Sequence, residues 1–423
     1  MNTQTVRSKK VFGLNKTLFK YISVSYLSIP VSLVTGFFAF RNIDPYYMGI
    51  WSAFTILETY AVFLRIGIVN GMNRELPFKM GKGDVSGAMK YAETTLAFTI
   101  LDVLLLFLLI PVAIYVVGFK EVYLVPLVIT VLRIIMSFYI TYLSATFRSD
   151  DNFDKLSNIQ IFLLVIKLLL CPLVLLGFYG FLAYELLLVL GNVILLHYYR
   201  PYRIKPKLHK PELIQLFKLG FPIFLSSYAI NFIDTLPKLY IIKESTAETL
   251  GLYSPVLMLL STVAILPNTL STYLYPKFSF NLGKEDDPMD IFRKLLKVYF
   301  YSFIVIVLAC IAGYFILDYF ILLFPKYNNS LPYLKLALLA CPFVFFKLGN
   351  MFNVVMKKYN YMLFFVLAYA LIQGVTLLLL PKYINDILDV VVVSQIITSV
   401  LVLLVSVLMN YILVQSLIRS KQT

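Results

Sequence analysis

Eleven ionisable side chains fall within long apolar stretches of this chain, where an isolated charge is costly. These six cations and five acids are Glu58, Arg65, Glu93, Asp102, Arg133, Lys167, Glu185, Asp234, Lys238, Lys335 and Lys347. A charged residue inside a membrane-spanning helix faces the bundle interior or a water-filled cavity, and it indicates a functional site by default. The spacing of these groups therefore predicts where a polar pathway lies.

Three of the cations lie deep within their apolar stretches. Arg133, Lys167 and Lys347 are near the middle, where a long side chain cannot extend to the headgroups. We expect them to face a cavity, and the alternative is a buried ion pair, for instance with Asp102. Glu185, Glu93 and Lys335 are nearer the ends of their stretches, where extension toward the membrane surface is the simpler interpretation.

Two further pairs have helical spacing. Glu58 and Arg65 are seven residues apart and share a helix face. Arg65 also precedes the small-residue pattern Gly67-x-x-x-Gly71, which permits close helix approach. Asp234 and Lys238 are four apart, at ion-pair spacing, with a helix-loosening proline between them. The acids Asp234, Glu58, Glu93 and Asp102 are candidate proton or sodium sites, and the alternative for each is a structural ion pair.

The composition predicts an integral membrane protein. Of 423 residues, 60% are apolar and only 14% are charged. The apolar runs are 20–30 residues long without two-residue alternation, so they predict helices rather than a barrel. We predict an all-α protein of twelve transmembrane helices, and their ranges are 17–40, 46–66, 88–117, 122–146, 156–178, 181–199, 219–243, 250–276, 291–320, 331–357, 359–380 and 387–418.

The lysines and arginines predict the orientation. With the N-terminus inside, cytoplasmic segments carry 26 of the 37 and outer loops carry five, so both termini are expected in the cytoplasm. The same placement explains most of the net charge of +15 and excludes nucleic acid as a partner. The first apolar run is too long for a cleaved signal. The chain has no phosphate-loop or H-E-x-x-H motif and no paired cysteines, so we expect no metal, cofactor or catalytic residue.

An internal repeat sets the expected architecture. Met48-Gly49-Ile50-Trp51-Ser52 matches Leu250-Gly251-Leu252-Tyr253-Ser254 at an offset of 202 residues, and a glycine follows each copy at the same distance, Gly81 and Gly283. Both copies run in the same direction. The repeat predicts two parallel six-helix bundles, residues 1–200 and 219–423, joined by a basic cytoplasmic linker at 201–218, with a central cleft for alternating access.

Several short motifs carry a family resemblance. They are Arg41-Asn42-Ile43-Asp44-Pro45-Tyr46-Tyr47-Met48-Gly49-Ile50-Trp51-Ser52, Gly67-Ile68-Val69-Asn70-Gly71-Met72-Asn73-Arg74, Gly81-Lys82-Gly83-Asp84, Asn231-Phe232-Ile233-Asp234 and Leu250-Gly251-Leu252-Tyr253-Ser254. Together they resemble the polysaccharide repeat-unit, or O-antigen, flippases of the multidrug/oligosaccharidyl-lipid/polysaccharide exporter superfamily. The resemblance covers nearly the whole chain. One departure is Thr235, where many relatives have an arginine.

The resemblance implies a monomeric transporter in the bacterial inner membrane. Its cargo would be an undecaprenyl-diphosphate-linked oligosaccharide for O-antigen (and so lipopolysaccharide), capsule or another exopolysaccharide, with H+ or Na+ as a coupling ion and membrane lipid around the cargo's tail. The cleft should offer cations to the diphosphate. The candidates for this role are Arg65, Arg133, Lys167, Lys238, Lys347 and Arg41.

Two other functions stay open. A cation-coupled multidrug exporter of the same superfamily would also have twelve helices, although an acidic cleft suits cationic drugs better. A membrane polysaccharide polymerase or ligase typically carries a sizeable outer loop with catalytic residues, whereas the longest outer loop here, near 321–330, has only Lys326 as a cation.

Overall fold

The computed structural model describes residues 16–81, 83–117, 120–150, 152–283, 288–356 and 358–422. Within these ranges the chain is helical and has no strand. The α-helices are α1 (Lys16–Asn42), α2 (Pro45–Ala61), α3 (Ile68–Gly81), α4 (Val85–Val117), α5 (Glu121–Ser149), α6 (Phe153–Leu170), α7 (Phe178–Tyr198), α8 (Lys210–Ile233), α9 (Leu236–Glu244), α10 (Ala247–Gly283), α11 (Pro288–Ile321), α12 (Leu331–Ala337), α13 (Lys347–Val355), α14 (Tyr359–Leu379) and α15 (Ile387–Gln422). Short 3-10 segments extend several of them: η1 (Val62–Arg65), η2 (Cys171–Leu176), η3 (Pro325–Ser330), η4 (Cys341–Phe346) and η5 (Leu380–Lys382).

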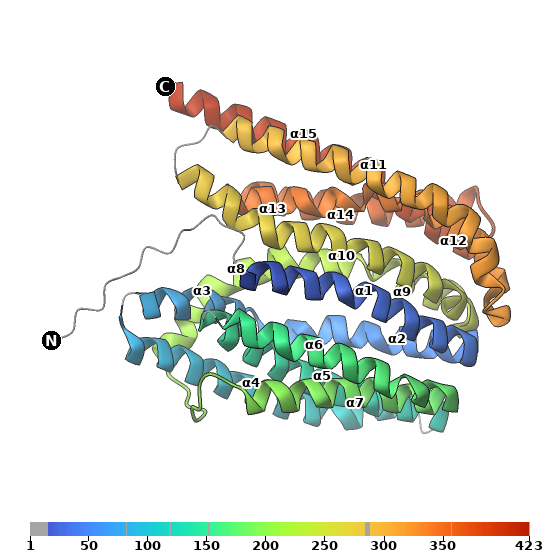
Figure 1. Ribbon diagram of the computed structural model, residues 1–423, viewed down its shortest axis with the longest axis horizontal. Coiled ribbons are helices and arrows are strands. Elements are labelled where there is room, and N and C mark those ends of the chain that lie inside the picture. The colour runs from blue at the N-terminus through green and yellow to red at the C-terminus, as the bar shows by residue number, and fades with distance from the viewer. Residues whose placement is uncertain are drawn as a thin grey trace.

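The helices form two layers (Figure 1). Helices α2 to α7 lie in one layer and α10 to α15 in the other, with α1, α8 and α9 between them. Of the described residues, nine helices are long and apolar enough to cross a membrane, and two bent pairs add up to two more spans. The bent pairs are α8 with α9, at 45°, and η3–α12 with η4–α13, at 54°.

Local sequence explains these two bends. Pro237 is at the start of α9 and cannot donate a backbone hydrogen bond, so the helix predicted over 219–243 breaks after Ile233. Pro342 has the same effect in the helix predicted over 331–357, since α12 ends at Ala337 and η4 follows at Cys341.

Two boundary predictions were wrong. No helix was predicted between residues 66 and 88, yet α3 extends from Ile68 to Gly81, because Ile68, Met72 and Leu76 recur at helical spacing and are all fully buried. A search for long apolar runs cannot find such a short, amphipathic helix. Likewise α8 begins at Lys210 rather than 219, since a proline is tolerated in the first turn of a helix.

The two copies of the repeat cross where α2 and α10 begin, and we call this end of the molecule the crossing end. A Cβ atom on Gly49 would overlap the carbonyl oxygen of Ala247, and one on Gly251 would overlap that of Pro45. Ser52 Oγ lies 3.0 Å from Ser254 Oγ. Under the 202-residue offset, the contact of Gly49 with Ala247 is equivalent to that of Gly251 with Pro45, and Ser52 is equivalent to Ser254. The crossing therefore has local two-fold pseudo-symmetry.

Side chains from distant parts of the chain seal the crossing end. Lys326 Nζ lies 2.8 Å from Asp44 Oδ1, and the Tyr327 hydroxyl donates to the Ile43 carbonyl at 3.2 Å. The Phe40 ring packs edge-on against that of Tyr327, with centroids 5.0 Å apart. The loop after α1 is thereby fixed to η3.

The opposite end, where the described chain begins in α1 and ends in α15, is called the terminal end. Here α3 packs tightly on α8. Gly67 has a φ of 82°, and a Cβ atom on it would lie 2.6 Å from the Gly220 carbonyl carbon. Gly71 likewise faces the backbone of Leu216. Small residues allow this close approach, as the Gly67-x-x-x-Gly71 pattern predicted.

Candidate functional site: a charged cavity and an uncharged chamber

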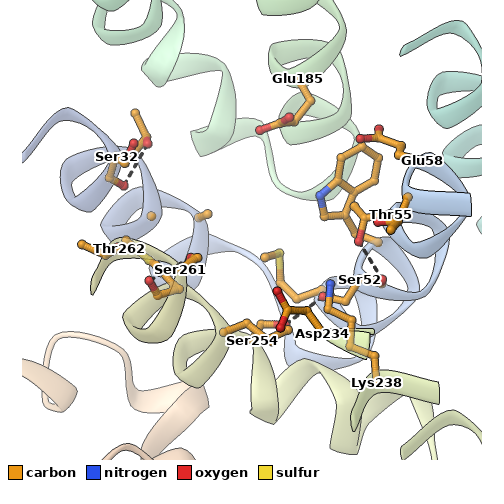
Figure 2. A pocket seen from close by; sticks show the side chains of 18 of the residues that line it. Ser32, Ser52, Thr55, Glu58, Glu185, Asp234, Lys238, Ser254, Ser261 and Thr262 are labelled. Carbon is orange, nitrogen blue, oxygen red and sulfur yellow. Dashed lines mark hydrogen bonds between the residues drawn. The ribbon is translucent and has the colours of Figure 1, made fainter. Parts of the chain in front are cut away.

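A cavity of about 990 Å³ lies among α1, α2, α5 to α8, α9 and α10. Figure 2 shows many of its side chains, with Glu58 and Glu185 on one side and Asp234 and Lys238 on the other. Its charged lining residues are Glu58, Lys167, Glu185, Asp234 and Lys238. Serine and threonine hydroxyls make up much of the remainder, so the surface combines fixed charge with many hydrogen-bonding groups.

Arg133 lies behind two of the cavity's acids. Its Nε atom is 2.8 Å from Glu58 Oε1, and its NH1 group pairs with Glu185. The guanidinium also lies 4.8 Å from the centroid of the Trp51 ring. Arg133 itself is not among the cavity's lining residues. The structure therefore places it in the ion pair that was its alternative interpretation, although the partners are Glu58 and Glu185 rather than Asp102.

Lys167 and Lys238 are the two cations that line the cavity. Lys167, on α6, donates from Nζ to Ser32 Oγ at 3.0 Å. Lys238, on α9, is close enough to Glu58 and Asp234 to interact electrostatically. Among the described residues, neither lysine has a carboxylate within the 4.0 Å of an ion pair. Their charges are thus less neutralised than that of Arg133.

Asp234 connects the cavity to a second, smaller one. The Tyr369 hydroxyl donates to Asp234 Oδ1 at 2.5 Å, and Asp234 lines both spaces. The second space has a volume of about 330 Å³, and we call it the amide chamber. Its polar lining residues are Asn231, Asp234, Ser261, Asn268, Tyr369, Gln373, Gln395, Thr398 and Ser399.

Other predicted cations lie outside the cavity lining. Arg65 is buried and donates to Thr141 Oγ1 at 2.9 Å, with its guanidinium 4.1 Å from the centroid of the Phe138 ring. Arg41 is exposed near the crossing end, 5.9 Å from the ring centroid of Phe37. Lys347 begins α13, and its side chain lies outside the described residues.

Two predicted acids also lie elsewhere. Asp102 is buried on α4, close enough to Arg65 to interact electrostatically. Glu93 Oε2 lies 2.9 Å from His209 Nε2 and so ties the linker to α4. The structure therefore brings together Glu58, Asp234, Lys167 and Lys238 at the cavity, with Arg133 directly behind Glu58, and it places Arg65, Arg41, Asp102 and Glu93 outside the cavity lining.

Glu93, Glu185 and Lys335 were expected to extend toward the membrane surface. Glu185 instead lines the cavity and pairs with Arg133. Glu93 lies beside His209, and Lys335 Nζ lies 2.6 Å from Asp318 Oδ1. Each charge has a partner from another segment of the chain, which a prediction from single helices cannot find. The amide chamber was also missed, because Gln373 and Gln395 are uncharged and carry no motif.

A family model described as polysaccharide biosynthesis protein matches residues 91–332, more than half of the chain. The chain belongs to this family. No functionally curated protein matches the sequence.

Several solved structures with a similar fold are transporters. An inward-facing multidrug resistance MATE family transporter of the MOP superfamily is 15% identical, with a TM-score of 0.65 over 95% of each chain. The Vibrio cholerae MATE transporter VcmN in its bent form is 13% identical, with a TM-score of 0.63 over 95% of this chain and 97% of that one. The MATE transporter ClbM in complex with Rb+ is 14% identical, with a TM-score of 0.60 over 92% and 94%. The prediction of an all-α, twelve-helix, multi-pass membrane fold is confirmed.

Proposed function

We propose that this protein is a flippase that moves undecaprenyl-diphosphate-linked oligosaccharide repeat units across the bacterial inner membrane. Its products would serve O-antigen, capsule or exopolysaccharide synthesis. The observation that carries the proposal is the pair Lys167 and Lys238, which face a cavity of about 990 Å³ lined with hydroxyl groups. A diphosphate cannot enter hydrocarbon without compensating partners, and two incompletely neutralised cations provide them.

The parts of the cargo match the parts of the cavity. The phosphates would bind Lys167 and Lys238, while sugar hydroxyls would bind the serines and threonines. Trp51, held against Arg133, offers an aromatic surface to a sugar ring. The polyprenyl tail would stay in the membrane lipid, so only the polar head needs a path through the protein.

We further propose that residues 1–200 and 219–423 rock against each other as two bundles joined by the linker at 201–218. The contacts of Lys326 with Asp44 and of Tyr327 with Ile43 hold the crossing end closed, so loading would occur from the terminal end. The excess of lysine and arginine at that end supports its placement, with both termini, in the cytoplasm.

Ion coupling rests on the acids that reach the cavity. Glu58 and Asp234 line it, whereas Glu93 and Asp102 do not, so we propose H+ or Na+ coupling at the first two. The complex of ClbM with Rb+ supports cation binding in this fold.

A multidrug exporter fits the cavity less well. Glu58 and Glu185 would attract a cationic drug, but Arg133 already neutralises much of their charge. A polymerase or ligase is not favoured either, since several solved structures with a similar fold are transporters.

Deletion of the gene in its host, followed by complementation, tests the function. We expect the deletion to remove surface polysaccharide and to accumulate the lipid-linked repeat unit on the cytoplasmic leaflet. Lys167→Met combined with Lys238→Met should fail to complement, while Lys382→Met, at an exposed lysine in η5, should complement fully. Unchanged polysaccharide in the deletion strain, together with raised drug sensitivity, would assign the chain to drug export instead.

A further inference from the structure

The amide chamber opens beside the charged cavity and belongs to the C-terminal half. Its walls come from α8, α10, η4, α14 and α15. The two spaces have four lining residues in common: Asn231, Asp234, Leu257 and Ser261. A ligand held in the charged cavity can therefore extend a neighbouring group into the chamber.

The chemistry of the chamber differs from that of the cavity. Among the described residues no lysine or arginine lines it, and Asp234, at the shared wall, is its only charged group. The amides of Asn231, Asn268, Gln373 and Gln395 each present both a donor and an acceptor. This mixture suits a ligand whose hydroxyls also donate and accept, whereas a phosphate or a carboxylate in the chamber would face Asp234 with no cation in the chamber's lining.

Hydrogen bonds outside the chamber hold its polar groups in place. Gln373 Nε2 donates to Ser394 Oγ at 2.8 Å, and Thr376 Oγ1 lies 2.7 Å from the same hydroxyl oxygen. Tyr369 is fixed by its bond to Asp234. A site whose side chains are already oriented loses less entropy when a ligand binds.

One acceptor in the chamber has no donor. Gln395 Oε1 is buried and accepts no hydrogen bond within the part of the chain that the structure describes, while the amide of Gln395 lies beside the buried Tyr253 hydroxyl. A buried polar atom without a hydrogen-bond partner is destabilising, and a ligand hydroxyl that donates to it would remove this cost.

The rings of Phe346 and Tyr369, with centroids 5.1 Å apart, add an apolar surface to the chamber. One water molecule occupies about 30 Å³ in the liquid. The chamber, with a volume of about 330 Å³, therefore has room for roughly a dozen heavy atoms, close to the size of one sugar ring. We propose that the amide chamber binds one uncharged sugar residue of the cargo while Lys167 and Lys238 hold the diphosphate. The inference rests on the proposed flippase function and assigns new binding residues, Gln373 and Gln395.

Native mass spectrometry on the full chain in detergent tests whether the two lysines bind the diphosphate and the amide chamber binds the sugar. The probes are undecaprenyl diphosphate and the undecaprenyl-diphosphate-linked repeat unit extracted from the chain's own host. We expect the wild type to bind the sugar-bearing lipid at least about tenfold more tightly than the bare lipid, since each well-placed hydrogen bond contributes up to about one factor of ten. Gln395→Leu and Gln373→Leu should each remove most of this preference while leaving the affinity for the bare lipid unchanged.

The bare lipid also reports whether each variant is folded. Gln415→Leu, on the same helix as Gln395 but in a half-buried position outside the chamber lining, is the matched control and should keep the full preference. If Gln395→Leu does not fold, Gln373→Leu gives the same test.

The outcomes separate the two proposals. If the wild type binds neither lipid, the flippase function fails. If it binds both equally, or if both glutamine variants keep the wild-type preference, the diphosphate site stands and the sugar chamber is overturned. The chamber is also overturned if the glutamine variants change only the dependence of binding on Na+, because it would then be a cation site.

Discussion

The segments 45–81 and 247–283 are copies of one another at an offset of 202 residues, yet they fold differently. The second is a single helix, α10, of 37 residues. The first is broken into α2, η1 and α3, because Ile66 and Gly67 both have positive φ, 39° and 82°. Their counterparts in α10 are Asn268 and Thr269, which continue the helix. The break turns α3 onto α8 at the terminal end.

The chemistry of the two copies differs as well. The first carries Glu58 and Arg65, where the second has Leu260 and Pro267 by the same offset. Only the crossing at Gly49 and Gly251 stays symmetric. The repeat thus determines how the halves meet, while charge is concentrated on one side of the cavity and amides on the other.

Arg133→Met should have the largest effect on stability, because it acts on the charged side. It would leave Glu58 and Glu185 without their cation, a loss of about 3 kcal/mol for a mostly buried pair. Thermal unfolding in detergent measures this loss. Adding Glu58→Gln and Glu185→Gln should restore most of the stability, and no restoration would contradict the pairing.

Gly67→Ala should come next, since it affects the break itself. Left-handed backbone costs an alanine about 1–2 kcal/mol, and the new Cβ atom would crowd the backbone of Gly220. We expect a clear fall in melting temperature. The control Gly374→Ala, whose Cβ atom would meet nothing within 4 Å, should cause no fall. Equal melting temperatures for the two variants would argue against the broken helix.

Gly49→Ala and Gly251→Ala should have effects that are equal to each other. Each would place a methyl group against the backbone of the opposing helix, at a cost of about 1–3 kcal/mol. Their melting temperatures should match within experimental error. A large difference between the two melting temperatures would show that the two contacts are alike in geometry but unequal in energy.

Much of the fold follows from local sequence signals. The apolar runs predicted the spans, and the glycines at 49 and 251 predicted the repeat, because span length and close helix approach depend on adjacent residues. The short helix α3 and the early start of α8 did not follow, since their stability comes from packing on each other.

The site was less predictable than the fold. Depth in a helix predicted that Arg133 and Lys167 face a cavity. Lys167 lines the cavity, whereas Arg133 lies behind it, paired with Glu58 and with Glu185, which is 52 residues away. The amide chamber depends on α8, α10, α14 and α15 meeting around Asp234. These partners come from different helices, so the sequence of a single helix cannot identify them.

The most direct test is the rate at which proteoliposomes containing the purified chain move the host's undecaprenyl-diphosphate-linked repeat unit between leaflets. The account predicts that wild-type protein and Lys382→Met flip at the same rate. Lys167→Met combined with Lys238→Met should flip about 100-fold more slowly, because two charge-assisted contacts to the diphosphate are lost. Flipping by the double variant at the wild-type rate would contradict the role of these two lysines and, with it, the central claim.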